Sequence, residues 1–444
     1  MEILRYLGAV ALVLGVLVFV HEFGHYAVAK LCGVRVEVFS LGFGKRLWGF
    51  RRGETDYRLS LLPLGGYVKM AGENPLESRT GDPGEFTSHP RWQRFLIAIA
   101  GPTMNILFAV AVLTAVYMIH DEEPIFLDKP AVIGWVKADS VAEKAGLQPG
   151  DRIIRIQDVN SPTWEHAFYK IMLNPSQPVD MAIERQGQIL TKTVVPTPAG
   201  KNQVGEIGVY PEEPTRIEVV EKERPAGRAG IQAGDEILAL NGTPVRSFDA
   251  FTALLQQNKD NPARISLLRN HQEVTVTAVP EYVADENNPS EHRYQIGIKR
   301  HLQTKTIKLP LGPAFDKSVA DCRTNSGLIF ELVSKLVRRK ISPRQVSGPI
   351  GIMEIAGEAT KEHGWTPLMK VMALISLNLA IFNLFPIPIL DGGLMLMLLI
   401  ESIMRRDISQ QIKERVYQAA FVFLILFAVM VIYNDVAKNL SGMS

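Results

Sequence analysis

The residues best suited to metal binding and catalysis are His21, Glu22 and His25, in the stretch His-Glu-Phe-Gly-His. On a helix, residues four apart lie on the same face, so the two imidazoles could bind one metal ion. Glu22 adjoins them and could act as general base toward a metal-bound water. With nine histidines and 46 acidic residues in the chain, chance predicts only about 0.02 such matches. The pattern therefore favours hydrolytic metal chemistry over a polar patch between helices.

A hydrolytic zinc site needs a third protein ligand and an open position for water. The candidate is Asp391, the other clear acid within an apolar run, in the stretch Asn383-Leu-Phe-Pro-Ile-Pro-Ile-Leu-Asp391-Gly-Gly. Its two prolines must interrupt regular helix. Broken helix within a membrane is tolerated where it lines a cavity or is buried in protein. The alternative for Asp391 is a solvated position at the end of a membrane span.

These residues lie in long apolar runs that must position them. Hydrophobic residues make up 47% of the 444 residues and charged residues only 21%. Crossing a bilayer takes about 20 apolar residues in helical form. Four runs meet this requirement, over 1–30, 95–119, 366–400 and 416–434. We therefore predict a multi-pass α-helical membrane protein with four transmembrane helices. The alternative is a signal peptide over 1–30 followed by buried core helices.

Charge and cysteine content exclude other classes of protein. Lys and Arg number 48 against 46 Asp and Glu, so bulk charge does not favour a nucleic-acid partner. The two cysteines, Cys32 and Cys322, are too few for a disulfide scaffold or a cysteine-rich zinc site. Nucleic acid is therefore not expected as a partner, and we expect a monomer.

The distribution of basic residues predicts the orientation in the membrane. The 31–94 loop carries Arg35, Lys45, Arg46, Arg51, Arg52, Arg91 and Arg94, and the connection before the last run carries Arg405, Arg406, Lys413 and Arg415. Short loops rich in Lys and Arg face the cytoplasm, whereas long translocated domains are exempt from this rule. The 31–94 loop is therefore expected to be cytoplasmic, and the 120–365 segment to lie outside.

The long outer segment contains an internal repeat. Residues 145–157 align with residues 229–241, 84 positions later, on the pattern Ala-Gly-Φ-x-x-Gly-Asp, where Φ is apolar. The pattern reads as a helix closed by glycine, a tight turn and a buried strand, and it resembles the PDZ domain. Two PDZ domains, mixed α/β but mainly β, are expected over 125–205 and 206–285. PDZ-like sheets accept extended peptides on a strand edge, although the copies could be structural spacers.

A further stretch predicts an amphipathic helix. Between Leu328 and Lys340, apolar residues fall on one helical stripe with basic residues beside it. We expect a surface helix over 320–345 that lies on the membrane, and packing against the rest of the protein is an equal alternative.

Taken together, these motifs resemble the site-2 protease family of intramembrane zinc metalloproteases, in its bacterial type with two tandem PDZ domains. The resemblance covers essentially the whole chain, with no departure at the metal or base positions. The matching motifs are His21, Glu22 and His25; Asn383, Pro386, Pro388, Asp391 and Gly392; Gly42-Phe43-Gly44; Gly101, Pro102 and Asn105; and Ser347 to Gly351.

This resemblance implies roles for individual residues. One zinc ion would be held by His21, His25 and Asp391, with Glu22 as the base. The stretch 57–70 resembles a membrane-associated β-loop that would hold substrate by strand addition, and an ordinary hairpin is the alternative. The substrate-binding residues would be Gly65, Gly66, Tyr67 and Val68 of this loop and the amides of Asn378 and Asn383. The amides could instead serve helix–helix hydrogen bonding.

The resemblance also implies the substrates and the location. Expected substrates are single-span membrane proteins of the anti-sigma-factor type, cleaved in regulated intramembrane proteolysis, or signal peptide remnants. The PDZ pair would filter substrates on the periplasmic side of the bacterial inner membrane, with the active site toward the cytoplasm. The alternatives are a membrane scaffold that tethers partners through its PDZ domains and an ion pathway. The complete ligand set argues against the scaffold, and the scarcity of other acids in the spans argues against the pathway.

Overall fold

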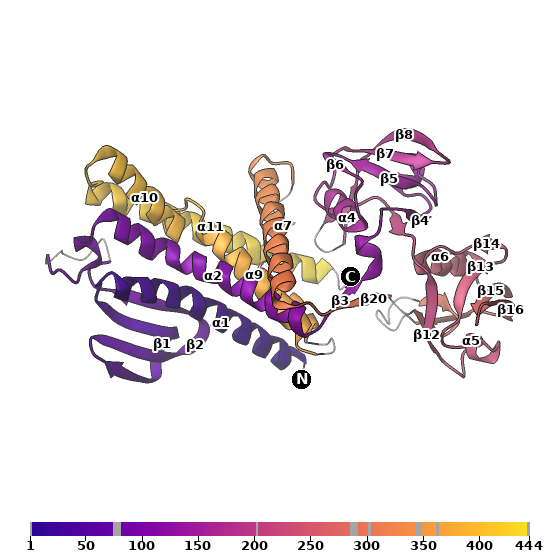
Figure 1. The fold of residues 1–444 in the computed structure, drawn as a ribbon, viewed down its shortest axis with the longest axis horizontal. Coiled ribbons are helices and arrows are strands. Elements are labelled where there is room, and N and C mark those ends of the chain that lie inside the picture. Colours follow the sequence, from indigo (N-terminus) through magenta and orange to yellow (C-terminus); the bar gives the residue numbers. More distant parts are fainter. Residues whose placement is uncertain are drawn as a thin grey trace. The chain divides into compact units, whose positions relative to one another are not determined.

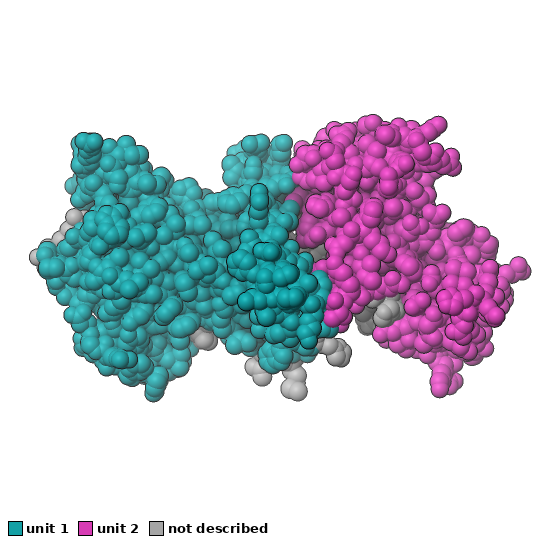
Figure 2. Space-filling view, in the orientation of Figure 1, with its two compact units in different colours: residues 1–121, 307–444 teal, residues 122–306 magenta. Residues whose placement is uncertain are grey.

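The computed structural model describes residues 2–73, 81–200, 203–284, 292–300, 303–341, 348–360 and 364–441. The chain forms two compact units, coloured separately in Figure 2. The helical unit comprises residues 1–121 and 307–444, and the inserted unit comprises residues 122–306.

The helical unit is built from long apolar helices (Figure 1). Its helices are α1 (Glu2–Leu31), α2 (Arg91–Ile119), α7 (Leu311–Val337), α8 (Pro349–Ala359), α9 (Thr366–Asn383), α10 (Asp391–Met404) and α11 (Gln410–Ser441), with a 3-10 turn, η1, at Phe86–Ser88. Four of the described helices, α1, α2, α9 and α11, are long and apolar enough to cross a membrane. Most apolar side chains of α11 stay exposed, as expected of a helix in contact with lipid.

The range 366–400, expected as one membrane span in which two prolines interrupt regular helix, contains two helices and a break. Helix α9 ends at Asn383 and α10 begins at Asp391. Between them Pro386 and Pro388 have no N–H to continue a helix, and the chain turns through short local hydrogen bonds instead. The break therefore places Asp391 at the first residue of a new helix.

Helix α7 begins earlier and ends earlier than the amphipathic helix expected over 320–345. Its buried residues Ala314, Ser318 and Cys322 recur every four positions and form one stripe. This stripe faces α2, where the Thr114 hydroxyl donates to Ser318 at 3.1 Å. The first half of α7 thus packs within the protein. Residues 342–345 lie outside the described residues, and contact of the second half with a membrane surface stays a prediction.

The Ser347–Gly351 motif forms the start of α8. The N–H groups of Gly348 and Ile350 donate to the Asp435 carboxylate of α11, at 3.0 and 3.1 Å. Asp435 is buried and satisfies N–H groups that have no partner within α8. The described part of the motif therefore joins α8 to α11, whereas Ser347 lies outside the described residues.

Two long strands, β1 (Val36–Arg52) and β2 (Thr55–Met70), form a sheet beside α1. Both strands bend, so each takes part in more than one pairing. Residues 36–41 lie between two partners, residues 66–70 on one side and residues 56–59 on the other. Residues 46–52 then pair with the opposite side of residues 55–60. The sheet therefore has four strand segments, with 66–70 at one edge and 46–52 at the other.

The inserted unit contains two copies of one fold, which we call the first and second repeats. The first has β4 (Ile133–Val136), α3 (Val141–Lys144), β5 (Arg152–Ile156), β6 (Val159–Asn160), α4 (Trp164–Met172), β7 (Val179–Arg185), β8 (Gln188–Val194), β9 (Thr197–Ala199), β10 (Val204–Glu206) and β11 (Val209–Pro211). The second has β12 (Thr215–Val220), α5 (Pro225–Arg228), β13 (Glu236–Leu240), β14 (Thr243–Pro244), α6 (Phe248–Asn258), β15 (Ala263–Arg269), β16 (Gln272–Ala278), β17 (Glu281–Ala284), β18 (His292–Gln295) and β19 (Ile298–Arg300). Near the ends of the unit lie β3 (Asp121–Pro124), the 3-10 turn η2 (Ile125–Asp128) and β20 (Thr304–Ile307).

The boundaries of the repeats differ from those expected at 205/206 and 285. Strand β11 pairs with β4, and Ile207 lies in the first core. Strand β19 pairs with β12, and Ile296 lies in the second core. Each repeat is thus closed by a last strand that returns to its first, and the first repeat ends near 211 and the second near 300. These closing strands are three residues long, too short for a clear sequence pattern.

The same buried ion pair recurs in both repeats. Asp235 accepts two hydrogen bonds from Arg269, at 2.7 and 2.8 Å, and Arg269 also donates to the Gly230 carbonyl. In the first repeat, Asp151 and Arg185 make the equivalent contacts 84 positions earlier. Burial alone would raise the pKa of Asp235, but the Arg269 guanidinium and a backbone N–H outweigh it and hold that pKa below its ordinary value. The contribution of Asp235 to stability is therefore present at neutral pH and lost as pH falls through its lowered pKa.

Replacing Asp235 with Asn should destabilise the second repeat alone. The Asp235 side chain is 2% exposed, so the change leaves Arg269 without its counter-charge and costs about 3 kcal/mol. Hydrogen exchange on the full chain would show faster exchange over residues 215–300, with the first repeat as internal reference. The control Asp158→Asn breaks an ion pair with Lys170 in which Asp158 is 76% exposed, and should cost less than about 1 kcal/mol. Unchanged protection in Asp235→Asn would contradict this role.

Candidate metal centre

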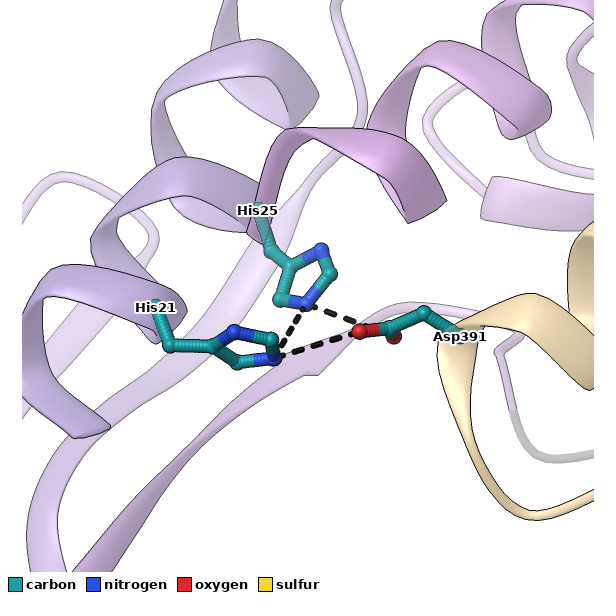
Figure 3. A group of neighbouring side chains, drawn as sticks. All are labelled: His21, His25 and Asp391. Atoms are coloured by element: carbon teal, nitrogen blue, oxygen red, sulfur yellow. Dashed lines mark hydrogen bonds and ion pairs between the residues drawn. The ribbon is translucent and has the colours of Figure 1, made fainter. Parts of the chain in front are cut away.

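Helix α1 brings His21 and His25 together, as their spacing predicts. The two Nε2 atoms are 3.2 Å apart, and both side chains are buried. The Asp391 carboxylate faces them from the start of α10, with Oδ2 3.2 Å from His21 Nε2 and Oδ1 3.4 Å from His25 Nε2 (Figure 3). The three predicted ligands, far apart in the sequence, thus meet at one point.

The spacing of these three groups fits a zinc ion. Zinc bound tetrahedrally at about 2.0–2.1 Å from each ligand atom separates neighbouring ligand atoms by about 3.3 Å. The two Nε2 atoms are 3.2 Å apart, His21 Nε2 is 3.2 Å from Asp391 Oδ2, and His25 Nε2 is 3.4 Å from the other carboxylate oxygen, Oδ1. All three groups carry lone pairs suited to zinc, and together they leave one tetrahedral position for water. His21, His25 and Asp391 also form a group of potential ligand atoms within 4.8 Å of one another.

Helix α2 orients both imidazole rings. His25 Nδ1 donates to the Ile97 carbonyl at 2.7 Å, which leaves the Nε2 lone pair directed toward the other ligands. The amide of Asn105 lies 3.3 Å from His21 Nδ1, and its Oδ1 is buried with no partner among the described residues. Rotating this amide by 180° would let Oδ1 accept from His21 Nδ1, because amide O and N are assigned from the hydrogen-bond network.

Two glycines allow α1 and α2 to approach this closely. A Cβ on Gly101 of α2 would overlap His25 Nε2 and lie 2.9 Å from His21 Cε1. A Cβ on Gly24 of α1 would overlap the Ala100 carbonyl of α2. Both positions therefore require glycine, and the space for the two rings depends on Gly101.

The turn before α10 is also packed on glycine. Gly392 and Gly393 lie directly against the carbonyl groups of Leu384 and Ile387, where a Cβ would overlap backbone atoms. The first turn of α10 can therefore fold tightly onto the proline-containing break. This contact fixes the start of the helix that carries Asp391.

Glu22 lines the same cavity as the three candidate ligands, a space of about 350 Å³. Its Oε2 accepts the N–H of Val68 at 2.9 Å, which ties the carboxylate to the edge segment 66–70 of the sheet. Glu73 also lines the cavity and accepts the Met70 N–H at 3.2 Å. Burial raises the pKa of Glu73 above its ordinary value.

The predicted substrate-binding residues fall into separate groups. Tyr67, Val68 and Asn383 line the catalytic cavity. Gly66 lies beside it, where a Cβ would be 3.7 Å from Glu22 Cγ.

The other two residues do not line this cavity. Gly65 lines an apolar groove between α1 and the sheet. Asn378 lies on α9, where its Oδ1 is buried without a partner among the described residues.

Sequence reasoning assigned no role to the α2 residues Ile97, Gly101 and Asn105. Gly101 and Asn105 were visible as a motif, but their function depends on which helix packs against α1. The contribution of Ile97 is a backbone carbonyl, which leaves no signal in a sequence.

The site combines two histidines on one apolar helix, a carboxylate that converges on them and an adjacent glutamate. This combination is typical of a zinc metalloprotease of the membrane. The sequence profile of Peptidase family M50 matches residues 9–427, and the chain belongs to this family. The regulator of sigma-E protease RseP of Escherichia coli is 31% identical, over 97% of this chain and 98% of its own length. A Vibrio cholerae protein named "Putative zinc metalloprotease" is 32% identical over the same shares of the two chains. The protein is thus a zinc metalloprotease.

Two solved PDZ domains are similar to about a fifth of this chain. The PDZ domain of the SdrC-like protein of Listeria innocua is 18% identical, with a TM-score of 0.18, and the match covers 20% of this chain and 97% of that domain. The corresponding PDZ domain from Listeria monocytogenes gives a TM-score of 0.17 at 18% identity, over 19% of this chain and 85% of that domain.

Replacing Gly101 with Ala should weaken zinc binding, because the new methyl group would occupy the space of both imidazoles. We expect a loss of at least about tenfold in zinc affinity, measured by competition with a chelator. Gly8→Ala on α1 is the matched control, since a Cβ there meets nothing within 4 Å. Equal zinc affinities for the Gly101 and Gly8 variants would show that this contact does not shape the site.

Proposed function

We propose that the protein is an intramembrane endopeptidase that cleaves transmembrane segments with one zinc ion held by His21, His25 and Asp391. The observation that carries the proposal is the convergence of these side chains in one cavity with Glu22, among helices apolar enough to cross a membrane. Two imidazoles and a carboxylate among apolar helices are costly unless they are paired or coordinated. Their preformed arrangement therefore supports a catalytic centre.

Glu22 is the proposed general base. Zinc bound at this site supplies a Lewis acid that lowers the pKa of a water and polarises the scissile carbonyl. Glu22 takes the proton of the attacking water and returns it to the leaving amine. The Val68 N–H, 2.9 Å from Glu22 Oε2, keeps the carboxylate oriented and leaves its other oxygen for this transfer.

The edge segment 66–70 is the proposed substrate-binding site. A helical segment cannot present a carbonyl for attack, because its carbonyls are already bonded within the helix. An extended segment could lie along this edge at Gly66, Tyr67 and Val68, beside Glu22. It would pair through the Gly66 backbone and the Val68 carbonyl, because the Val68 N–H is bonded to Glu22. The amide of Asn383, which lines the cavity, could bond the substrate backbone. Roles for Gly65 and Asn378 have less support, because neither lines the cavity.

The proposed location is the bacterial inner membrane, with the metal centre toward the cytoplasm and the inserted unit in the periplasm. Basic residues follow α1 and precede α11, as expected of cytoplasmic loops. Single-span proteins of the anti-sigma-factor type are the proposed substrates, together with signal peptide remnants. The relative in E. coli is named a regulator of sigma-E protease, which supports the first class.

The two repeats of the inserted unit are proposed to be PDZ domains that filter substrates. In each, a glycine with positive φ, Gly208 or Gly297, precedes the closing strand. The closing strands β11 and β19 end their sheets among the described strands. Such an edge can accept an extended peptide. This supports recognition of the new chain end that a substrate exposes once its outer domain has been cleaved off.

Replacing Glu22 with Gln should abolish cleavage while leaving zinc bound, because the amide cannot accept the proton but the three ligands are unchanged. We expect a loss of about 10²–10⁴-fold in turnover of a single-span reporter, with metal content measured on the same sample. Asp391→Ala should lose both zinc and activity, because it removes a ligand. Normal turnover by Glu22→Gln would remove the base assignment, and full zinc occupancy in Asp391→Ala would point to another third ligand.

Removing the inserted unit should broaden substrate use. The Ile125 N–H bonds the Gln303 carbonyl at 2.9 Å, so residues 126–302 can be replaced by a short Gly-Ser turn. The truncated protein should cleave reporters with and without a large outer domain at similar rates, whereas the parent should favour the trimmed one. Retained preference for trimmed reporters in the truncated protein would contradict the filter.

A further inference from the structure

Helix α10 connects the metal centre to a second polar cluster. Asp391 is its first residue, and Glu401 lies ten residues later, about 15 Å along the axis at 1.5 Å per residue. After Gly393 the helix has no glycine or proline that would favour bending. A displacement of Glu401 along this unbroken helix would therefore also move its first turn, which carries Asp391.

Glu401 makes a buried ionic contact with the neighbouring helices. Its side chain is 1% exposed, and Oε1 accepts from Lys413 Nζ of α11 at 2.7 Å and from the Ile408 N–H at 3.1 Å. On the other side, Arg91 Nε of α2 lies 4.0 Å from Oε2. We call this group the Glu401 contact. It joins α10 closely to α11 through Lys413 and, at longer range, to α2 through Arg91, which also pairs with Asp407 at 2.7 Å. Breaking it would leave the Lys413 ammonium, which is 16% exposed, without this partner.

The inward face of α10 between its two ends borders open space. A cavity of about 80 Å³ lies next to the Glu401 contact, and it shares Glu73, Phe86 and Leu394 with the catalytic cavity. Leu394 and Leu398 of α10 therefore face a hollow along part of their length. Close packing, which elsewhere fixes a helix, is incomplete on this side. Beside this hollow, the Glu401 contact anchors the far end of α10 to α11 through Lys413.

Helix α2 is the common reference for all three candidate ligands. Its Ile97 carbonyl and Asn105 amide orient the imidazoles, and its Arg91 faces Glu401. The Glu401 contact thus ties the helix that carries the carboxylate to the helix that orients the two rings. Metal ligands separated by 3.2–3.4 Å tolerate little displacement of one from the others.

We propose that Glu401 is a positioning residue for Asp391, and that the Glu401 contact sets the zinc affinity of the centre from about 15 Å away. The inference rests on the proposed role of Asp391 as a metal ligand. Glu401 lies about 15 Å along α10 from the candidate ligand Asp391, and it acts through the length of this helix.

The test is the zinc affinity of Glu401→Gln in the full chain, measured by competition with a chelator. We expect zinc binding about tenfold weaker than in the parent, the loss typical of altered support around a metal ligand. With a cleavable reporter, kcat should fall and KM should stay unchanged. A merely structural role would lower the unfolding temperature without changing the zinc affinity of the folded protein.

Two comparisons make the test specific. Glu414→Gln makes the same chemical change one residue from Lys413, outside the Glu401 contact, and should bind zinc as the parent does. Lys413→Met removes the strongest partner and should weaken zinc binding, whereas Lys413→Arg keeps the charge and should restore most of the affinity. This second pair serves if Glu401→Gln does not fold.

Zinc affinities of Glu401→Gln, or of Lys413→Met, within twofold of the parent would overturn the proposal. Asp391→Ala in the same assay separates this outcome from failure of the proposed metal site. If Asp391→Ala loses zinc while the Glu401 variant keeps it, the positioning role alone is wrong. If Asp391→Ala also keeps zinc, the ligand assignment itself fails.

Discussion

The structure depends on the meeting of two imidazoles and a carboxylate among apolar helices. Unpaired, each of these groups would be costly in surroundings that offer little water. Because the two Nε2 atoms lie 3.2 Å apart and each lies 3.2–3.4 Å from one Asp391 oxygen, a single divalent ion can satisfy the three groups together. Three surrounding features bring these groups and Glu22 together. Helices α1 and α2 cross closely at glycine, the break before α10 places Asp391 at a helix start, and the sheet beside α1 bonds Glu22.

Helix α2 organises the centre, although it contributes no candidate ligand. It provides the Ile97 carbonyl for one ring, the Asn105 amide for the other and the glycine that makes room for both. Supporting groups of this kind set the tautomer and direction of metal-bound histidines. A description limited to His21, Glu22, His25 and Asp391 would therefore omit the helix that orients the two imidazole rings.

The sequence was sufficient to single out the three candidate ligands that converge and the apolar helices, because both leave strong local patterns. The His21–His25 spacing specifies a shared helical face, and a lone acid in an apolar run is conspicuous. The sequence was not sufficient for contacts made by backbone or by distant side chains. The Ile97 carbonyl has no sequence signal, and Arg185 and Arg269 could not be paired with Asp151 and Asp235 without the fold. The repeat boundaries were misplaced because their closing strands are only three residues long.

The neighbouring ends of the inserted unit have a consequence for how this architecture can change. The chain leaves the helical unit after residue 121 and returns at residue 307, and the two segments run together at Ile125 and Gln303. When the two connections to an inserted unit lie side by side, the size of the insert does not change the distance that they must span. The helices on either side of the insertion can then keep their packing. Inserted units of other sizes could therefore be exchanged at this junction without any alteration of the helical unit.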